Sequence, residues 1–145
     1  MKISVLAGLV AVLILSLFPL LAAPGTNEHT PKPPAKSPSP GMSRVQVEEF
    51  EKLWKDKKNI VLDVRTQKEF NAGHIPGATN LDVNLPDFEK KISTLDKDKV
   101  YLVHCAVGVR SARACEKMGR LGFRHLIDLA PGFKGWEKAG KTIEK

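Results

Sequence analysis

Short apolar runs alternate with helix-like segments over the last 100 or so residues of the chain, about five times. The continuous runs at 59–64 and 100–104 are typical of strands that are buried on both faces of a parallel sheet. Shorter runs predict further strands near 45–47, 78–82 and 125–128. Apolar spacing and capping residues predict helices over 47–54, 86–92, 111–121 and 133–139, and a capping box at 66–69 predicts another short helix from 66 onward. This alternation predicts an α/β fold with a mostly parallel five-stranded sheet and helices on both faces.

The first 43 residues differ in composition from the rest. No charged residue lies between Lys2 and Glu28, and the apolar stretch between them ends in small residues, as in a secretory signal. We expect a signal peptide at 1–25, cleaved after Gly25. The alternative is an uncleaved N-terminal anchor, because the stretch approaches the roughly 20 residues that span a bilayer. The remainder is then exported, to the periplasm or as a membrane-anchored protein that faces the periplasm.

Residues 26–43 are rich in proline and contain few apolar side chains, which predicts an extended linker. The domain at 44–145 holds 20 of the 23 basic and 15 of the 16 acidic residues, a net charge of about +5. These charges are spread out and not interleaved with aromatic residues, so we expect no nucleic-acid partner and a preference for small anions. No cluster has metal-ligand spacing and no glycine-rich nucleotide loop occurs, so we expect no metal and no cofactor.

Cys105 directly follows the run at 100–104 and opens a short loop that contains Gly108 and leads into a helix. In parallel sheets ligands bind beyond the carboxyl ends of the strands, where this cysteine lies. Backbone N–H groups of such a loop can converge on an anion, so we expect an accessible, ionised thiol that acts as a nucleophile. Arg110 in the same loop would lower the thiol pKa and attract an anionic substrate. His104 precedes the cysteine, but adjacent strand residues point to opposite faces, so we expect a structural role for it.

Three other residues are placed by the same reasoning. Cys115 lies on the apolar face of the next helix, too far along it for a disulfide with Cys105, and is expected to be a buried structural thiol. Asp63 and Arg65 stand at the carboxyl end of the run at 59–64. We expect both to support the site as a structural pair with Glu69 or with the neighbouring loop.

Three segments resemble the signatures of rhodanese-like domains. The segment 62–80 resembles the first signature, 105–111 the active-site loop, and 122–123, 129–132 and Trp136 the closing segment. The likeness covers essentially all of 44–145 in the expected order and departs at Pro131, where many members have glycine. It implies the three-layer rhodanese-like fold and a sulfurtransferase.

In that family a thiolate takes a sulfane sulfur from a donor such as thiosulfate, holds it as a persulfide, and passes it to an acceptor. The acceptor is cyanide, a small thiol or a protein thiol. The resemblance assigns catalysis to Cys105. It assigns substrate binding, mostly through the backbone, to Ala106, Val107, Gly108, Val109 and Arg110.

Two other functions stay open. A persulfide carrier or redox-sensing binding module would load sulfur at Cys105 but turn over poorly with small molecules. The segment 104–111 also resembles the loop of cysteine phosphatases and arsenate reductases. Here only four residues separate Cys105 from Arg110, where phosphatases have five, so the cradle is expected to suit one sulfur atom better than a tetrahedral oxyanion.

Overall fold

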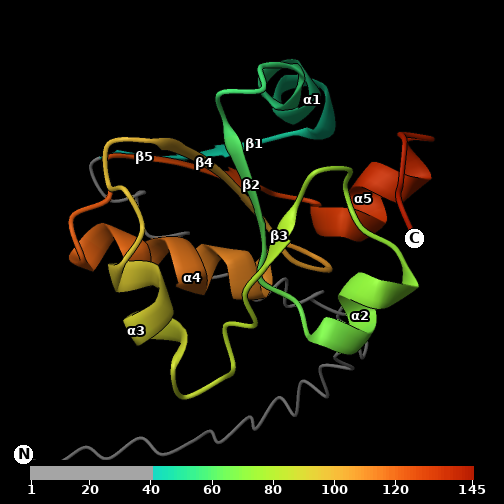
Figure 1. The fold of residues 1–145 in the computed structure, drawn as a ribbon. Coiled ribbons are helices and arrows are strands. Elements are labelled where there is room, and N and C mark those ends of the chain that lie inside the picture. Colours follow the sequence, from blue (N-terminus) through green and yellow to red (C-terminus); the bar gives the residue numbers. More distant parts are fainter. Residues whose placement is uncertain (1–40) are drawn as a thin grey trace, which may run out of the picture. The chain divides into compact units, whose positions relative to one another are not determined.

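The computed structural model describes residues 41–145, and the predicted signal or anchor segment and nearly all of the linker lie outside the described residues. The strands are β1 (Met42–Val45), β2 (Ile60–Asp63), β3 (Thr79–Asn80), β4 (Val100–His104) and β5 (His125–Leu129) (Figure 1). The helices are α1 (Val47–Lys55), α2 (Gln67–Ala72), α3 (Phe88–Ser93), α4 (Val109–Arg120) and α5 (Gly132–Lys138). Within 41–145, every helix is too short or too polar to cross a membrane.

The five strands form one sheet in the order β1-β5-β4-β2-β3, and every neighbouring pair is parallel. The predicted sheet is therefore confirmed. Strand β4 lies in its centre, between β5 and β2. The register pairs Asp63 with His104, so β2 and β4 end at the same edge and Cys105 follows there.

Helices cover both faces of the sheet, as the alternation predicts. Helices α3 and α4 lie on one face of the sheet and α1 and α5 on the other (Figure 1). Their buried side chains belong to two separate core clusters, one on each face. Strand β4 shows why: Tyr101, Val103 and Cys105 belong to the core under α3 and α4, whereas Leu102 belongs to the core under α1 and α5. The period of two along a strand thus directs Cys105 to the α4 side.

Several element boundaries differ from the sequence prediction, among them those of β1, β3 and α4. The first strand ends at Val45, and Val47 begins α1, where it is buried. Strand β3 contains two residues, whereas the sequence predicted five. Helix α4 begins at Val109, two residues earlier than predicted, because Gly108 adopts a left-handed conformation (φ 81°) from which the chain enters the helix directly. This earlier start brings the first turn of α4 to the cysteine loop.

A capping box fixes the start of α2, as predicted. The backbone N–H of Glu69 donates to Thr66 Oγ1 (3.3 Å), and the Glu69 carboxylate accepts from the backbone N–H of Thr66 (3.1 Å). The box therefore holds the Glu69 side chain in a defined orientation at this end of the helix.

Candidate active site

The loop after β4 is held from outside by α5. The N–H groups of Phe133 and Lys134 donate to the carbonyl oxygens of Cys105 (2.7 Å) and Ala106 (3.0 Å). Glycine is required at position 108 for two reasons. A Cβ there would collide with the Ala130 carbonyl oxygen, and the positive φ of this residue is unfavourable for any side chain. With these carbonyl groups bound by α5, the next N–H groups of the loop are free to face the sulfur.

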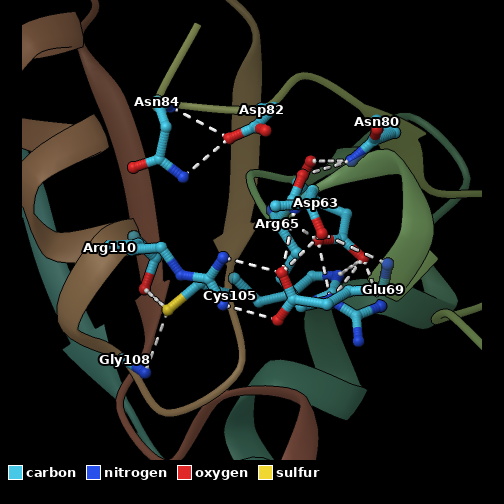
Figure 2. A network of polar contacts seen from close by, with 12 residues as sticks. Asp63, Arg65, Glu69, Asn80, Asp82, Asn84, Cys105, Gly108 and Arg110 are labelled. Atoms are coloured by element: carbon cyan, nitrogen blue, oxygen red, sulfur yellow. Dashed lines mark hydrogen bonds and ion pairs between the residues drawn. The ribbon is translucent and has the colours of Figure 1, made fainter.

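Hydrogen-bond donors converge on Cys105 Sγ (Figure 2). The N–H of Gly108 donates at 3.2 Å and the Ser111 hydroxyl at 3.5 Å, and the backbone N–H groups of Val107 and Ser111 also contribute to lowering the pKa of the thiol. Burial is the strongest single influence and raises the pKa of the Cys105 thiol. The hydrogen bonds from Ser111, Val107 and Gly108 together outweigh it, so the pKa lies below its ordinary value. Of the predicted main-chain donors, the Gly108 N–H is bonded to the sulfur.

The expectation of an accessible thiol was wrong for this conformation. Cys105 is 0% exposed, and Ser111 beside it is equally buried. The sulfur packs in the core under α3 and α4, since the early start of α4 brings Ser111 against it. Val107 and Val109 are 51% and 64% exposed, so the outer side of the loop faces solvent. A reagent reaches the sulfur only after the loop or a side chain beside it moves.

Arg110 is paired with Glu69 across 41 residues of sequence (Figure 2). Its Nη1 and Nη2 donate to Glu69 Oε2 (2.8 Å) and Oε1 (2.6 Å). These bonds, helped by those from Thr66, hold the pKa of Glu69 at about 2. The sequence assigned the lowered pKa of Cys105 to Arg110. In the structure the strongest lowering comes from Ser111 and the loop amides, and Glu69 balances the charge of Arg110.

Asp63 and Arg65 pair with each other beneath the site. Arg65 Nε and Nη2 donate to the Asp63 carboxylate (3.0 and 2.6 Å), and Nη2 also donates to the Gly73 carbonyl (2.7 Å). The guanidinium carbon lies 4.1 Å from the centre of the Phe133 ring, and both charged residues are buried. The structural pair is therefore observed, but Glu69 is not its partner. Arg65 connects the end of α2 to α5, which holds the cysteine loop.

His104 faces away from the sulfur, as expected. Its ring lies near the rings of Phe50 and Phe133 on the α1 and α5 side of the sheet. Burial, only partly offset by Asp63, lowers the pKa of His104 to about 4, so the imidazole is neutral near pH 7. His104 is thus not placed to accept a proton from Cys105.

The second cysteine is a free, buried thiol. Cys115 lies in the core under α4, and no disulfide joins it to Cys105. Burial first, and the nearby Asp128 second, raise the pKa of Cys115 well above its ordinary value, which makes it inert. Among residues 41–145, we find no group of three or more His, Cys, Asp or Glu side chains placed to bind a metal ion.

Sequence reasoning missed three residues of this site. Ser111 lies within the motif at 105–111, and the sequence alone predicts no role for it, although a hydroxyl in the first turn of the next helix is a usable signal. The sequence correctly places Glu69 in the capping box and offers it as one of two alternative partners of Asp63 and Arg65, but it does not predict the pair with Arg110. Asp128 was not singled out, although a carboxylate inside the apolar run of β5 is unusual.

A hollow of about 300 Å³ lies beside the loop, next to Ala106. Charged side chains of both signs line it, among them Arg65, Glu69, Lys134 and Glu137. It gives a small polar molecule room next to the loop that carries Cys105.

Comparison with known proteins identifies the family. The model of the rhodanese-like domain matches residues 46–139. "Putative sulfurtransferase YtwF" of Bacillus subtilis is 35% identical over 95 residues, which cover 66% of this chain and 87% of the relative. "Putative sulfur carrier protein YrkF" of the same organism is 34% identical over 100 residues; the match covers 68% of this chain and 51% of that protein, so the chain spans about half of its length.

Solved structures agree with this result. A rhodanese-related protein from Thermoplasma volcanium superimposes with a TM-score of 0.63 and 30% identity, and the match covers 70% of this chain and 96% of that one. The fold, the cysteine loop and these comparisons lead to one conclusion: the chain belongs to the family of rhodanese-like domains.

Proposed function

We propose that the domain is a sulfurtransferase that moves a sulfane sulfur from thiosulfate or a similar anionic donor to cyanide or a thiol. The observation that carries this proposal is the convergence of the Val107, Gly108 and Ser111 N–H groups and the Ser111 hydroxyl on Cys105 Sγ. Donors in this arrangement stabilise a sulfur anion, whether thiolate or persulfide, in a buried site. The relatives named for sulfur transfer and sulfur carriage support the same chemistry.

In the first half-reaction the Cys105 thiolate attacks the outer sulfur of thiosulfate. The new S–S bond forms at Cys105 as the bond between the outer sulfur and the sulfonate breaks, and sulfite leaves with the electron pair. The charges balance, since a thiolate and a dianion give a persulfide anion and a dianion. The loop amides then hold the persulfide.

In the second half-reaction cyanide or an acceptor thiolate attacks the outer sulfur of the persulfide. Thiocyanate or a new persulfide leaves, and the Cys105 thiolate is regenerated. The moderate positive charge of the domain favours the approach of anionic donors. Because Cys105 is fully buried, both steps require the loop or a side chain beside it to move.

The test is to load the purified domain with thiosulfate, weigh the intact protein, then add cyanide and measure thiocyanate. We expect the mass of one added sulfur atom and steady turnover, both lost in Cys105→Ser. Cys115→Ser is the matched control and keeps both, because the Cys115 thiol is buried and inert. No mass gain, or a gain that persists in Cys105→Ser, contradicts the proposal, and hydrolysis of an aryl phosphate would favour the phosphatase chemistry instead.

A persulfide carrier is the second candidate, because the exposed outer side of the loop is apolar. Val107 and Val109 are exposed there, and Arg110 is already paired with Glu69. An apolar rim suits an acceptor thiol on a protein better than a small anion. This candidate predicts that the domain gains one sulfur atom from thiosulfate but forms thiocyanate slowly.

We also propose that the domain is exported, through the apolar segment between Lys2 and Glu28. N-terminal sequencing of the mature protein from the host membrane and soluble fractions tests this. Cleavage after Gly25 supports a signal peptide, and an intact N-terminus in the membrane fraction supports an anchor. An intact N-terminus in the soluble fraction contradicts both.

A further inference from the structure

A buried carboxylate lies behind the cysteine, in a position that the proposed reaction does not yet use. Asp128 is 0% exposed, and neither of its carboxylate oxygens accepts a well-aligned hydrogen bond. Its one charged neighbour among the described residues is Arg44, whose Nη1 lies 3.0 Å from Oδ2 and whose side chain is 43% exposed. A buried carboxylate with so little compensation is costly unless it binds a proton.

The strand register places Asp128 on the same side of the sheet as Cys105. Asp128 pairs with Val103 of β4, and Cys105 is two residues further along, so both side chains point toward α4. Ser111 and Cys115 line the buried face of α4 that covers them. The groups that face the Asp128 carboxylate are therefore Ser111 and Cys115 from α4 and Arg44 from β1.

Ser111 lies on the buried face of α4 beside both the sulfur and the carboxylate. Its hydroxyl donates to Cys105 Sγ at 3.5 Å, so neither oxygen of Asp128 accepts a hydrogen bond from it in this arrangement, although Ser111 offsets part of the rise that burial causes in the pKa of the Asp128 carboxyl. A serine has one O–H donor and two acceptor positions. While it donates to the sulfur, it can still accept a hydrogen bond from a protonated Asp128.

The burial of Cys105 makes such an internal acceptor useful. A thiol at 0% exposure has no water at hand to take its proton, and His104 lies on the other side of the sheet. The Ser111 hydroxyl leads from the sulfur to a group that binds a proton readily.

We propose that Asp128 accepts the Cys105 proton through Ser111. The thiol proton passes to Ser111 Oγ as the Ser111 hydroxyl proton passes to a carboxylate oxygen of Asp128. The products are a thiolate and a neutral carboxyl, joined as Asp128 O–H to Ser111 Oγ and Ser111 O–H to Cys105 Sγ. Atoms and charge balance, and the net charge of the site is unchanged when the thiolate forms. An anionic sulfur donor therefore meets no additional negative charge.

This proposal deepens the proposed function, since it concerns how Cys105 becomes a nucleophile. Its test needs no sulfur donor, so failure of persulfide formation and failure of the relay are separate results. The thiolate is followed by its ultraviolet absorbance against pH in the full chain, with Cys105→Ser subtracted as the blank. Protonated carboxyl groups are followed over the same pH range by their infrared carbonyl band.

Two coupled groups that share a proton titrate in two macroscopic steps. We expect the wild-type thiolate signal to rise in two steps, with an infrared carboxyl band that persists between them. Asp128→Asn should lose one step and the band. Ser111→Ala should also give a single step, and Ser111→Thr, which keeps a hydroxyl, should restore the second. Asp82→Asn is the matched control: it removes a carboxylate near the loop that does not contact Ser111, and it should keep both steps.

A single wild-type step, or two steps that survive in Asp128→Asn, overturns the proposal. Equal loss of a step in Asp82→Asn overturns it as well, because a general charge effect would then suffice. If Asp128→Asn does not fold, the wild-type infrared band decides alone: its absence across the range where the thiolate forms refutes the relay.

Discussion

Glu69→Gln isolates the charge that faces Arg110. Glutamine has the size of glutamate and keeps a side-chain oxygen that can accept from the Thr66 N–H, so the cap of α2 is retained. What it removes is the negative partner of the Arg110 guanidinium. The substitution therefore measures the stabilisation due to this ion pair.

The expected magnitude follows from the pKa of Glu69, which Arg110, helped by Thr66, lowers from 4.5 to about 2. Each pKa unit corresponds to about 1.4 kcal/mol, which sets a ceiling of about 3.4 kcal/mol. The Glu69 side chain is 34% exposed, so solvent screening reduces the effect to about 1–2 kcal/mol. We expect Glu69→Gln to lower the free energy of unfolding near pH 7 by this amount.

The pH dependence gives the sharper check. Because the folded-state pKa of Glu69 is depressed, its stabilisation is present above pH 4.5 and is lost as the pH falls through about 2. Urea unfolding of wild type and variant, followed by tryptophan fluorescence across this range, should show the difference shrinking only below pH 4.5. The reasoning fails if the difference is the same near pH 2 as near pH 7, or absent throughout. Glu89→Gln is the control. The Glu89 side chain, which pairs with Lys117, is 57% exposed, so this ion pair should contribute little to the free energy of unfolding.

The remaining predictions concern the loop, its support and the core. Gly108→Ala should lower the free energy of unfolding by more than the roughly 1–2 kcal/mol of a left-handed residue, because its Cβ collides with Ala130. Gly140→Ala, at φ 67° in open space, should show only the backbone cost in urea unfolding. Arg65→Met should cost about 3–5 kcal/mol in the same assay, because it leaves the buried Asp63 unpaired, and an unchanged midpoint would refute this. Ile92→Ala should cost about 2–5 kcal/mol, since Ile92 is fully buried; a loss under about 1 kcal/mol would contradict its place in the core.

Much of the fold of this domain can be predicted from short stretches of its sequence. The apolar runs of β2 and β4 are continuous because both faces of a central parallel strand are covered, so their pattern predicts burial and position together. The capping box at Thr66 fixed the start of α2, since its bonds join residues three apart. The place of Cys105 after β4 followed in the same way, from a strand that ends and a loop that contains Gly108.

The chemistry of the site, by contrast, depends on pairs that are distant in sequence. Arg110 pairs with Glu69, 41 residues away in sequence. The sequence instead predicts that Arg110 acts on the Cys105 thiol. Asp128 comes to lie behind Cys105 only through the register of β5 against β4, and Ser111 comes between them only because α4 starts two residues early.

Local patterns determined the helices, the strands and the place of Cys105 at the end of β4, because propensity and burial act over a few residues. Tertiary packing decided the exposure of the Cys105 sulfur, the partner of Arg110 and the surroundings of Asp128. Burial and electrostatic pairing depend on which elements meet in space, and that information is absent from any short stretch of the chain.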